Sequence, residues 1–322
     1  MSSLLPSVYP SRAAERDAWI LNRRPARASL DPYLPYEYFV EEECAPGGTI
    51  GPVATVFLTN RECPFRCLMC DLWRNTLTEA VPPGAIPAQI DHALHRLPPA
   101  RQLKLYNSGS FFDPQAIPPS DYAAIAQRAR RFERLIVENH PALVGEACLS
   151  FRDLLGGTLE IAMGLETVHP EVLAGLNKRM TLDQFSVGAN FLRRNTIDLR
   201  VFILVQPPLM AAAVALQWAE RSLEFAMEQG ATAVTLIPTR AGNGAMEALA
   251  ASGQFAPPAL HILESAMEYG LGLKAGRIFS DLWGLPVSCA DCHAQRATRL
   301  RQMNLQQVVL DRIPCARCGG VS

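Results

Sequence analysis

Residues 58–73, LTNRECPFRCLMCDLW, place three cysteines in a short loop directly after an apolar run at 53–58. The apolar run has the length and composition of a buried strand. The cysteines, Cys63, Cys67 and Cys70, are spaced by four and then three positions, so their thiols can reach one metal centre. Three protein ligands leave one iron of a four-iron cluster free to bind another molecule. The stretch therefore predicts metal-dependent chemistry at the end of a strand.

Two other interpretations of these cysteines are a zinc site and buried thiols that are neighbours by chance. A structural zinc site normally takes four ligands from paired Cys-x2-Cys turns. This loop offers three cysteines in an asymmetric array. The spacing therefore favours an iron-sulfur cluster.

The Cys-x3-Cys-x2-Cys pattern, with Pro64, Phe65 and Arg66 between its first two cysteines, resembles the signature of radical S-adenosylmethionine (SAM) enzymes. The resemblance implies a [4Fe-4S] cluster on Cys63, Cys67 and Cys70 whose open iron chelates SAM. In that family an electron from the cluster cleaves SAM to a 5'-deoxyadenosyl radical, which abstracts hydrogen from a substrate. It also implies an electron donor such as a flavodoxin or ferredoxin.

Length and composition set the class of protein. A chain of 322 residues accommodates one large α/β domain with extensions, and its net charge of −1 gives no global sign of nucleic-acid binding. The start of the chain lacks the apolar core of a signal peptide, and the apolar region 201–219 is interrupted by Gln206, Pro207 and Pro208. Nine cysteines, seven of them clustered, suit metal binding in a reducing cytoplasm. We expect a cytoplasmic protein without a membrane segment.

From residue 51 onward, strand and helix patterns alternate, as in a parallel sheet. The predicted strands are 53–58, 102–106, 134–138, 158–165, 199–205 and 233–237. Six such units match the partial (β/α)6 barrel that the resemblance implies. We predict an irregular N-terminal arm at 1–50, a barrel core at 51–280, and a small four-cysteine metal-binding module at 281–322.

In such folds, ligands bind at the carboxyl ends of the strands. The second predicted strand is followed by Ser108, Gly109 and Ser110, small residues that let a backbone approach a ligand. Their position corresponds to the family's glycine-rich motif that contacts the SAM amino group, although an ordinary turn is the alternative. The third strand ends at Glu138, whose carboxylate we also assign to cofactor binding, and His140 follows it as a further candidate.

Three later strand residues complete the predicted cofactor site. Glu160 and Glu166 lie within and just after the fourth predicted strand, and a carboxylate inside a barrel is costly unless it has a partner or ligand. Glu166 has a plainer alternative, capping the next helix. Gln206 ends the fifth predicted strand, where its amide can form hydrogen bonds.

Further motifs restrict the resemblance to one group of radical SAM enzymes. The runs SGSFFDP, ENHP and GLET, with the stretch 243–258, resemble the group that contains the archaeosine-biosynthesis radical SAM protein and, more distantly, the Elongator catalytic subunit. The resemblance covers roughly residues 50–310 and implies tRNA modification together with a partner modification enzyme.

The C-terminal segment contains a second metal-binding pattern. Cys289 and Cys292 form one Cys-x2-Cys pair, and Cys315 and Cys318 form another. Two such pairs predict a tetrahedral site with zinc as the usual metal, while a second iron-sulfur cluster stays open.

Two basic groups have two interpretations each, RNA phosphate binding or a solvated surface. The first is the N-terminal group Arg23, Arg24 and Arg27; the second, between the cysteine pairs, is Arg296, Arg299, Arg301 and Arg312.

Taken together, the sequence predicts a radical SAM enzyme that abstracts hydrogen from a modified nucleoside in tRNA. A small molecule or a peptide is the alternative substrate. From another class of protein, the alternative is a zinc-ribbon RNA-binding protein whose barrel has lost catalysis. The presence of all three loop cysteines argues against that loss.

Overall fold

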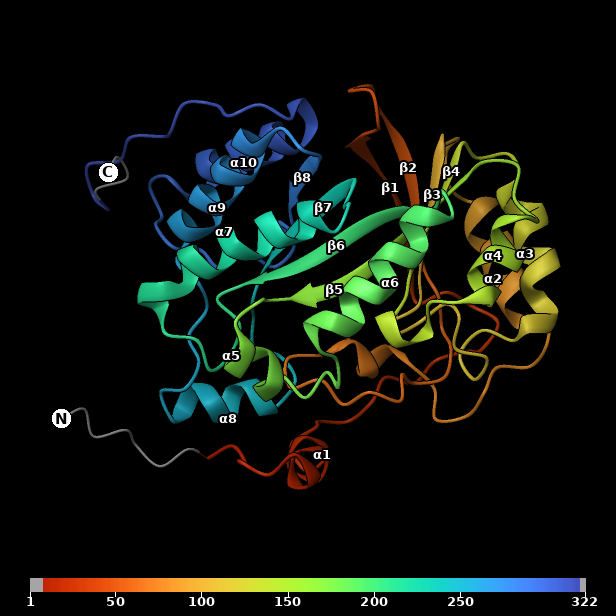
Figure 1. Cartoon of the computed structure of the whole chain (residues 1–322), viewed down its shortest axis with the longest axis horizontal. Coiled ribbons are helices and arrows are strands. Elements are labelled where there is room, and N and C mark those ends of the chain that lie inside the picture. The colour runs from red at the N-terminus through yellow and green to blue at the C-terminus, as the bar shows by residue number, and fades with distance from the viewer. Residues whose placement is uncertain (1–7, 319–322) are drawn as a thin grey trace.

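The computed structural model describes residues 8–318, which form one curled sheet with helices on its outer face (Figure 1). The eight strands follow one another in chain order across the sheet, and only the first pairing, β1 with β2, is antiparallel. The strands are β1 (Glu37–Cys44), β2 (Ile50–Phe57), β3 (Gln102–Tyr106), β4 (Arg134–Glu138), β5 (Thr158–Glu166), β6 (Asp198–Val205), β7 (Ala233–Pro238) and β8 (Arg277–Ser280).

Residues 8–318 contain ten α-helices, of which all but the first and the last connect strands of the sheet. They are α1 (Ala13–Leu21), α2 (Ala85–Leu94), α3 (Tyr122–Ala129), α4 (Glu146–Arg152), α5 (Pro170–Gly175), α6 (Leu182–Arg194), α7 (Ala212–Glu228), α8 (Ala245–Ala251), α9 (Leu260–Leu273) and α10 (His293–Gln306). Within residues 8–318, none of the helices is both long and apolar enough to cross a membrane.

The α/β half-barrel predicted from the sequence is confirmed, and all six predicted strands are present. The structure adds β8 and, within the arm that we expected to be irregular, β1. Strand β1 escaped prediction because its sequence, EYFVEEEC, carries four glutamates, a residue depleted in strands. Two of them, Glu41 and Glu43, are paired with Lys104 of β3 at 2.8 and 2.6 Å.

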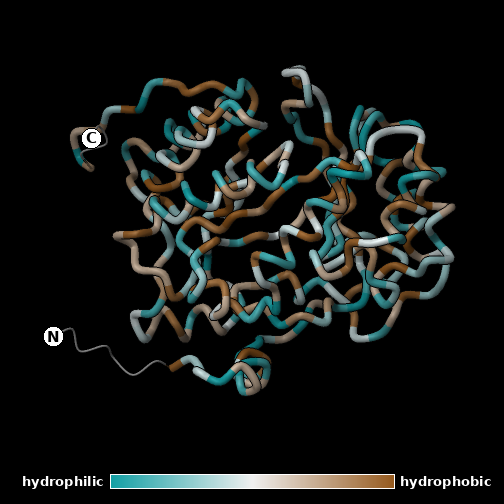
Figure 2. The backbone as a smooth tube through the Cα atoms, in the orientation of Figure 1, coloured by the Kyte–Doolittle hydropathy of each residue, from teal (hydrophilic) through white to brown (hydrophobic). Residues whose placement is uncertain are grey.

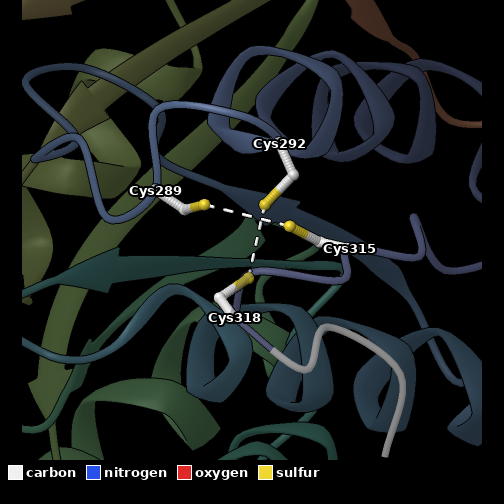
Figure 3. A group of neighbouring side chains, drawn as sticks. All are labelled: Cys289, Cys292, Cys315 and Cys318. Atoms are coloured by element: carbon white, nitrogen blue, oxygen red, sulfur yellow. Dashed lines mark hydrogen bonds between the residues drawn. The ribbon is translucent and has the colours of Figure 1, made fainter.

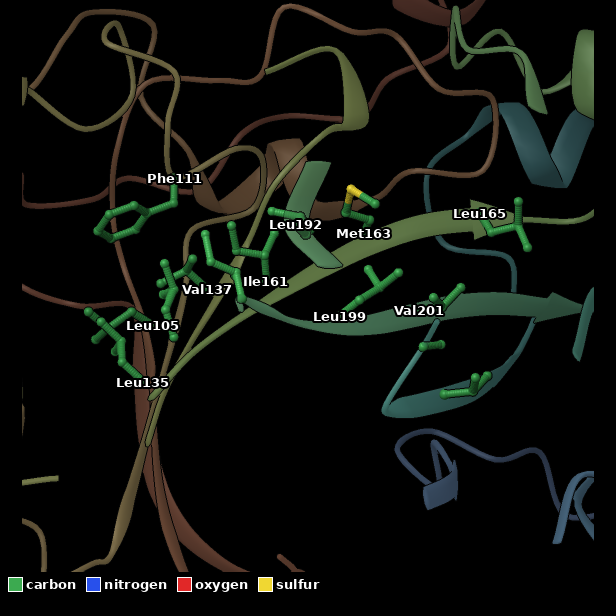
Figure 4. Packing of buried hydrophobic residues seen from close by; sticks show 14 of the residues in the cluster. Leu105, Phe111, Leu135, Val137, Ile161, Met163, Leu165, Leu192, Leu199 and Val201 are labelled. Atoms are coloured by element: carbon green, nitrogen blue, oxygen red, sulfur yellow. The ribbon is translucent and has the colours of Figure 1, made fainter. Parts of the chain in front are cut away.

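Alternation along β5 separates an apolar outer face from a polar inner face. On β5, Ile161, Met163 and Leu165 pack in the main core between the sheet and the helices, together with Leu192 of α6 (Figure 4). Figure 2 shows the hydrophobic residues as brown stretches along the central strands. The inner face of β5 instead carries Glu160, Ala162, Gly164 and Glu166, so it is available for polar groups.

Charged residues from the inner faces of neighbouring strands form a buried ion-pair network at the base of the half-barrel. Arg200 on β6 bonds Glu43 and Glu160, each at 2.6 Å, and its side chain is 2% exposed. Glu160 also accepts hydrogen bonds from Arg134 and Arg277, both at 3.0 Å. Burial alone would raise the pKa of Glu160, but the arginines, led by Arg200, lower it. The network therefore joins β1, β4, β5, β6 and β8 by charge.

Helix α10 covers the open edge of the sheet. The side-chain amide of Gln307 accepts from the backbone N–H of Ile278 at 2.7 Å and donates to its carbonyl at 2.8 Å. Asn304 does the same for Ser280, at 2.8 and 2.9 Å. These amides satisfy the backbone groups that a further strand would have bonded, so β8 is not left as an exposed edge.

Most of the arginines between the C-terminal cysteine pairs have structural partners. Arg296 pairs with Glu264 at 2.5 Å, and Arg299 and Arg312 both pair with Glu268 at 2.7 Å. These side chains hold α10 and the following chain against α9. Three of the four arginines are therefore engaged within the protein.

We expect Arg200→Met to lower the free energy of unfolding by about 3–5 kcal/mol, because it leaves Glu43 and Glu160 buried with one cation fewer. Urea denaturation measures the loss. Arg101→Met is the matched control, since it removes a pair with Glu133 whose side chains are 52% and 59% exposed, and it should cost less than about 1 kcal/mol. Equal losses in the two variants would contradict a stabilising role for the network.

Candidate active site

A cavity of about 1120 Å³ runs through the inside of the half-barrel. Its lining includes all three cysteines of the loop after β2 and the ends of β3, β4 and β5. Of the residues predicted to bind the cofactor, five line this cavity: Ser108, Gly109, Ser110, Glu138 and Glu166. The two that do not line it are Glu160 and Gln206.

The three loop cysteines open onto the cavity with the donor set expected for a cluster. Burial raises the pKa of each thiol, Cys63, Cys67 and Cys70, to about 12. The thiols are therefore neutral without metal, and iron binding must release their protons. Three cysteine ligands around one cavity fit an iron-sulfur cluster with one iron open to the cavity.

Two asparagines from distant segments hold the backbone of this loop. Asn177, after α5, donates from its side chain to the carbonyl of Arg66 at 2.8 Å. Asn243, before α8, donates to the carbonyls of Leu68 and Cys70 at 2.8 and 3.1 Å. A loop outside regular structure needs such partners for its buried carbonyls. No sequence pattern pointed to Asn177, whereas Asn243 opens one of the runs that carried the resemblance.

The N-terminal arginines also fix the loop. Glu62, just before the first cysteine, pairs with Arg24 at 2.7 Å, Arg27 at 2.5 Å and Arg66 at 3.0 Å. Burial would raise the pKa of Glu62, but the hydrogen bonds from Arg27 and Arg24 lower it overall. Arg23 lies over the ring of Trp19 instead. The basic group therefore has neighbours within the protein, and two of its members support the cysteine loop.

The loop after β3 lies directly against the cysteine loop. A methyl group on Gly109 would lie 3.2 Å from the β-carbon of Cys63, so a larger residue would push the two loops apart. Ser108 has a φ of +53°, and the hydroxyl of Ser110 accepts from the backbone N–H of His140 at 3.0 Å. These contacts bring the predicted SAM-binding loop beside the first cysteine.

Glu138, at the end of β4, faces this same loop. Its carboxylate accepts from the backbone N–H of Asn107 at 3.0 Å. Burial raises the pKa of Glu138 to about 7, against the opposing effect of the N–H groups of Asn107, Ser108 and Gly109. The carboxyl group therefore titrates near neutral pH and can hold or release a proton inside the cavity.

Glu166 and Lys178 form a buried ion pair near the cysteines. Strand β5 continues to Glu166 through a register shift, and Glu166 has a φ of +66°. A methyl group on Gly164 would lie 2.1 Å from the Glu166 carboxylate and 2.4 Å from the Lys178 ammonium, so only glycine leaves room for the pair. Burial would lower the pKa of Lys178, but Glu166, and then Cys67, raise it. Sequence reasoning missed Lys178, which lies in a loop without a motif.

The structure places the remaining candidates in supporting positions. Glu160 belongs to the ion-pair network at the base of the half-barrel, and the Gln206 amide donates to the carbonyl of Ala256 at 2.9 Å. His140 stacks on Phe65 with their ring centres 3.8 Å apart, and burial lowers its pKa to about 4. The neutral imidazole thus supports the residue between the first two cysteines.

The four C-terminal cysteines converge in a separate site (Figure 3). Their sulfur atoms all lie within 4.8 Å of one another, with 3.9 Å between Cys289 and Cys315 and 3.5 Å between Cys292 and Cys318. The backbone N–H groups of Cys318 and Arg317 lower the pKa of Cys315 to about 7, which favours a thiolate ligand. The donor set fits a metal ion.

Comparison with known proteins finds a sequence relative and solved structures that share the fold. No model of a protein family matches the chain. The archaeosine synthase subunit beta of Methanosarcina acetivorans is 27% identical over 258 residues, which are 75% of this chain and 74% of that protein. Methylornithine synthase (PylB) superposes with a TM-score of 0.52 at 14% identity, covering 79% of this chain and 71% of that one. Streptococcus suis SuiB, bound to precursor peptide SuiA, gives 0.52 at 10% identity, covering 69% and 47%.

The archaeal relative and PylB are both radical SAM proteins. In sequence and fold, the chain is similar to radical SAM enzymes. The superfamily implies SAM and a [4Fe-4S] cluster as cofactors, and the cysteine loop beside the glycine-containing loop is where this structure has residues that fit them. The family resemblance deduced from the cysteine spacing is thereby confirmed.

We expect Asn243→Ala to reduce the iron bound per chain after anaerobic reconstitution to less than about half of the wild-type value. The variant leaves two buried carbonyls of the cysteine loop without a donor, each costing roughly 1–3 kcal/mol. Iron analysis and the thermal midpoint are the measurements, with Asn22→Ala, at an exposed position after α1, as control. Wild-type iron content in Asn243→Ala would show that the loop does not depend on these bonds.

Proposed function

We propose that this protein cleaves SAM reductively and abstracts hydrogen from a nucleoside of tRNA. The observation that carries the proposal is the meeting of three cysteines, a glycine-containing loop and two strand-end carboxyl groups in one cavity. When bound, a [4Fe-4S] cluster on Cys63, Cys67 and Cys70 supplies the electron that converts SAM to a 5'-deoxyadenosyl radical. Such a cluster needs an external donor, for which a flavodoxin or ferredoxin is the expected class.

The residues around the cysteines have distinct roles in this proposal. The loop Ser108–Gly109–Ser110 offers backbone groups and hydroxyls to SAM at the position nearest Cys63. Glu138 holds that loop in place and can accept a hydrogen bond from the amino group. The Glu166 and Lys178 pair presents one anion and one cation to the zwitterionic part of SAM. Since Glu160 and Gln206 lie outside the cavity lining, we leave them out of this cofactor site.

The substrate class rests on the archaeal relative. That protein is named as a subunit of archaeosine synthase, and it aligns with three quarters of this chain. A modified nucleoside in tRNA is therefore the substrate that we propose, with a separate modification enzyme as partner. We keep the reducing cytoplasm as the proposed location, because it would preserve the nine free cysteines.

The alternatives have less support. PylB and SuiB share the fold, but at 14% and 10% identity they do not argue for a small-molecule or peptide substrate. A non-catalytic RNA-binding protein would not need three cysteines facing a cavity of this size. The complete cysteine loop and its supporting contacts favour the enzyme.

We expect anaerobically reconstituted protein, given SAM and dithionite, to form 5'-deoxyadenosine, detected by chromatography. Cys67→Ala should reduce the product by at least about 100-fold, because it removes a cluster ligand. Cys148→Ala is the control, since Cys148 is buried on α4 away from both metal sites. Absence of product from a wild-type protein that holds its cluster would contradict the proposal.

For the C-terminal site we propose one zinc ion. Four sulfurs at about 2.3 Å from one tetrahedral zinc lie roughly 3.8 Å apart, which agrees with separations of 3.5 and 3.9 Å. An iron-sulfur cluster would hold its cysteines farther apart, because the ligands must surround several irons rather than one ion. A zinc module here would tie the segment after α10 to the segment before it.

We expect purified protein to contain about one zinc per chain and Cys289→Ser/Cys315→Ser to contain none, as measured by plasma mass spectrometry. Cys148→Ser should keep its zinc. The double variant should also lose thermal stability, since the metal bond contributes to folding. Iron instead of zinc at this site, after mild removal of the cluster in the first loop, would overturn the assignment.

A further inference from the structure

Aromatic side chains line the cavity from the inner faces of three strands. Phe57 on β2 lies 5.9 Å from Tyr106 on β3, with an angle of 67° between the rings. Tyr106 lies 6.3 Å from Phe202 on β6, at 85°. All three are half-buried, and all line the cavity that the cysteines share. They give the cavity an apolar wall of edge-to-face contacts.

Trp283, in the turn after β8, extends this wall. Its ring lies 6.1 Å from Phe57 at 71°, and it lines the same cavity, yet 59% of the residue is exposed. Among aromatic residues in the described part of the chain, only Trp283 and Tyr33 are exposed. A large aromatic ring left bare at a cavity is a frequent mark of a binding site.

The backbone of Trp283 is fixed on both sides although its ring is uncovered. Its N–H donates to the carboxylate of Asp281 at 2.9 Å, and its carbonyl accepts from Arg240 at 2.6 Å. Asp281 and Arg240 also pair with each other at 3.3 Å. The indole therefore occupies a preorganised position, and ligand binding does not require the free energy of ordering this turn.

An arginine lines the cavity beside this turn. Arg301 on α10 is exposed, and its guanidinium has no hydrogen bond or ion pair among residues 8–318. It precedes Asn304 by one helical turn, and Asn304 is bonded to Ser280, three positions before Trp283. Arg301 is thus the one member of the C-terminal arginine group without a carboxylate partner in this part of the structure.

We propose that Trp283 is the stacking platform for a nucleobase drawn out of the tRNA, and that Arg301 contacts a phosphate of the same strand. Proteins that read unpaired RNA commonly stack its bases on aromatic side chains and neutralise its backbone with arginine. A base must leave its stack for a buried radical site to reach it. The inference rests on the proposed function and adds the residues that select a planar, anionic substrate.

Affinity for unfractionated tRNA tests the stacking role. Loss of one base–aromatic stack costs about 1–3 kcal/mol, so Trp283→Ala should weaken binding by about 5- to 150-fold. Trp283→Phe keeps a stacking face and should retain most of the affinity. Trp218→Phe, on the outer helix α7, is the matched control. Iron content and thermal midpoint show whether each variant folds.

Tryptophan fluorescence locates the contact. Adding tRNA should quench wild-type emission, and the quenching should be lost in Trp283→Phe but kept in Trp218→Phe. SAM alone should leave the Trp283 signal unchanged. Quenching by SAM alone would overturn the inference, because it would assign the ring to the cofactor.

Salt dependence tests the role of Arg301. Arg301→Gln should lower the slope of log affinity against log salt by about one phosphate contact. Arg131→Gln removes an exposed arginine after α3 and should leave the slope unchanged. An unchanged slope in Arg301→Gln would overturn the phosphate contact.

Failure of the stacking inference and failure of the proposed function would give different results. If wild-type protein forms 5'-deoxyadenosine and binds tRNA, but Trp283→Ala binds equally well, the stacking inference is wrong and the proposed function stands. If wild-type protein with its cluster forms no 5'-deoxyadenosine, the proposed function fails whatever Trp283 does. If it forms 5'-deoxyadenosine but shows no binding to tRNA, both the inference and the tRNA substrate are rejected.

Discussion

The loop that carries three half-buried cysteines depends on distant segments for hydrogen bonds to its backbone carbonyls. Asn177 and Asn243 supply donors to its carbonyls from segments that lie more than 100 positions later in the chain. Glu62 anchors the start of the loop to arginines of the N-terminal arm. Because unpartnered buried carbonyls are costly, contacts from the arm, the segment after α5 and the segment before α8 together stabilise the arrangement in which the thiols face one cavity.

The inner face of the half-barrel is divided by function. At its base, Glu43 and Glu160 neutralise a group of cations and join β1 to the later strands. Toward the cysteines, Glu138 and the Glu166–Lys178 pair keep charge available beside the cavity. The charges of the network and of the Glu166–Lys178 pair are tolerated inside because each has a partner of opposite sign, whereas Glu138 is held by backbone N–H groups. One face of a sheet can therefore be rigid at one end and reactive at the other.

The C-terminal segment covers the edge of the half-barrel and lines part of its cavity. Asn304 and Gln307 complete the edge of β8, and the four cysteines hold the chain on both sides of α10. The same helix places Arg301 beside the turn that carries Trp283. A metal ion at these cysteines, as proposed, would support the positions of Arg301 and Trp283 at the cavity.

The sequence by itself determined the cysteine loop, the six parallel strands and the paired C-terminal cysteines, because each depends on short spacings or local alternation. Only the tertiary structure decided which carboxylates reach the cavity. Glu160 and Glu166 share one strand and the same alternation, yet Glu160 meets three arginines from other strands while Glu166 meets Lys178 beside the cysteines. Asn177 and Trp283 were likewise beyond prediction, since Asn177 bonds Arg66 and Trp283 contacts Phe57 and Arg240, all distant in sequence. Which partner a buried charge finds is settled by packing across the sheet, and local sequence does not encode it.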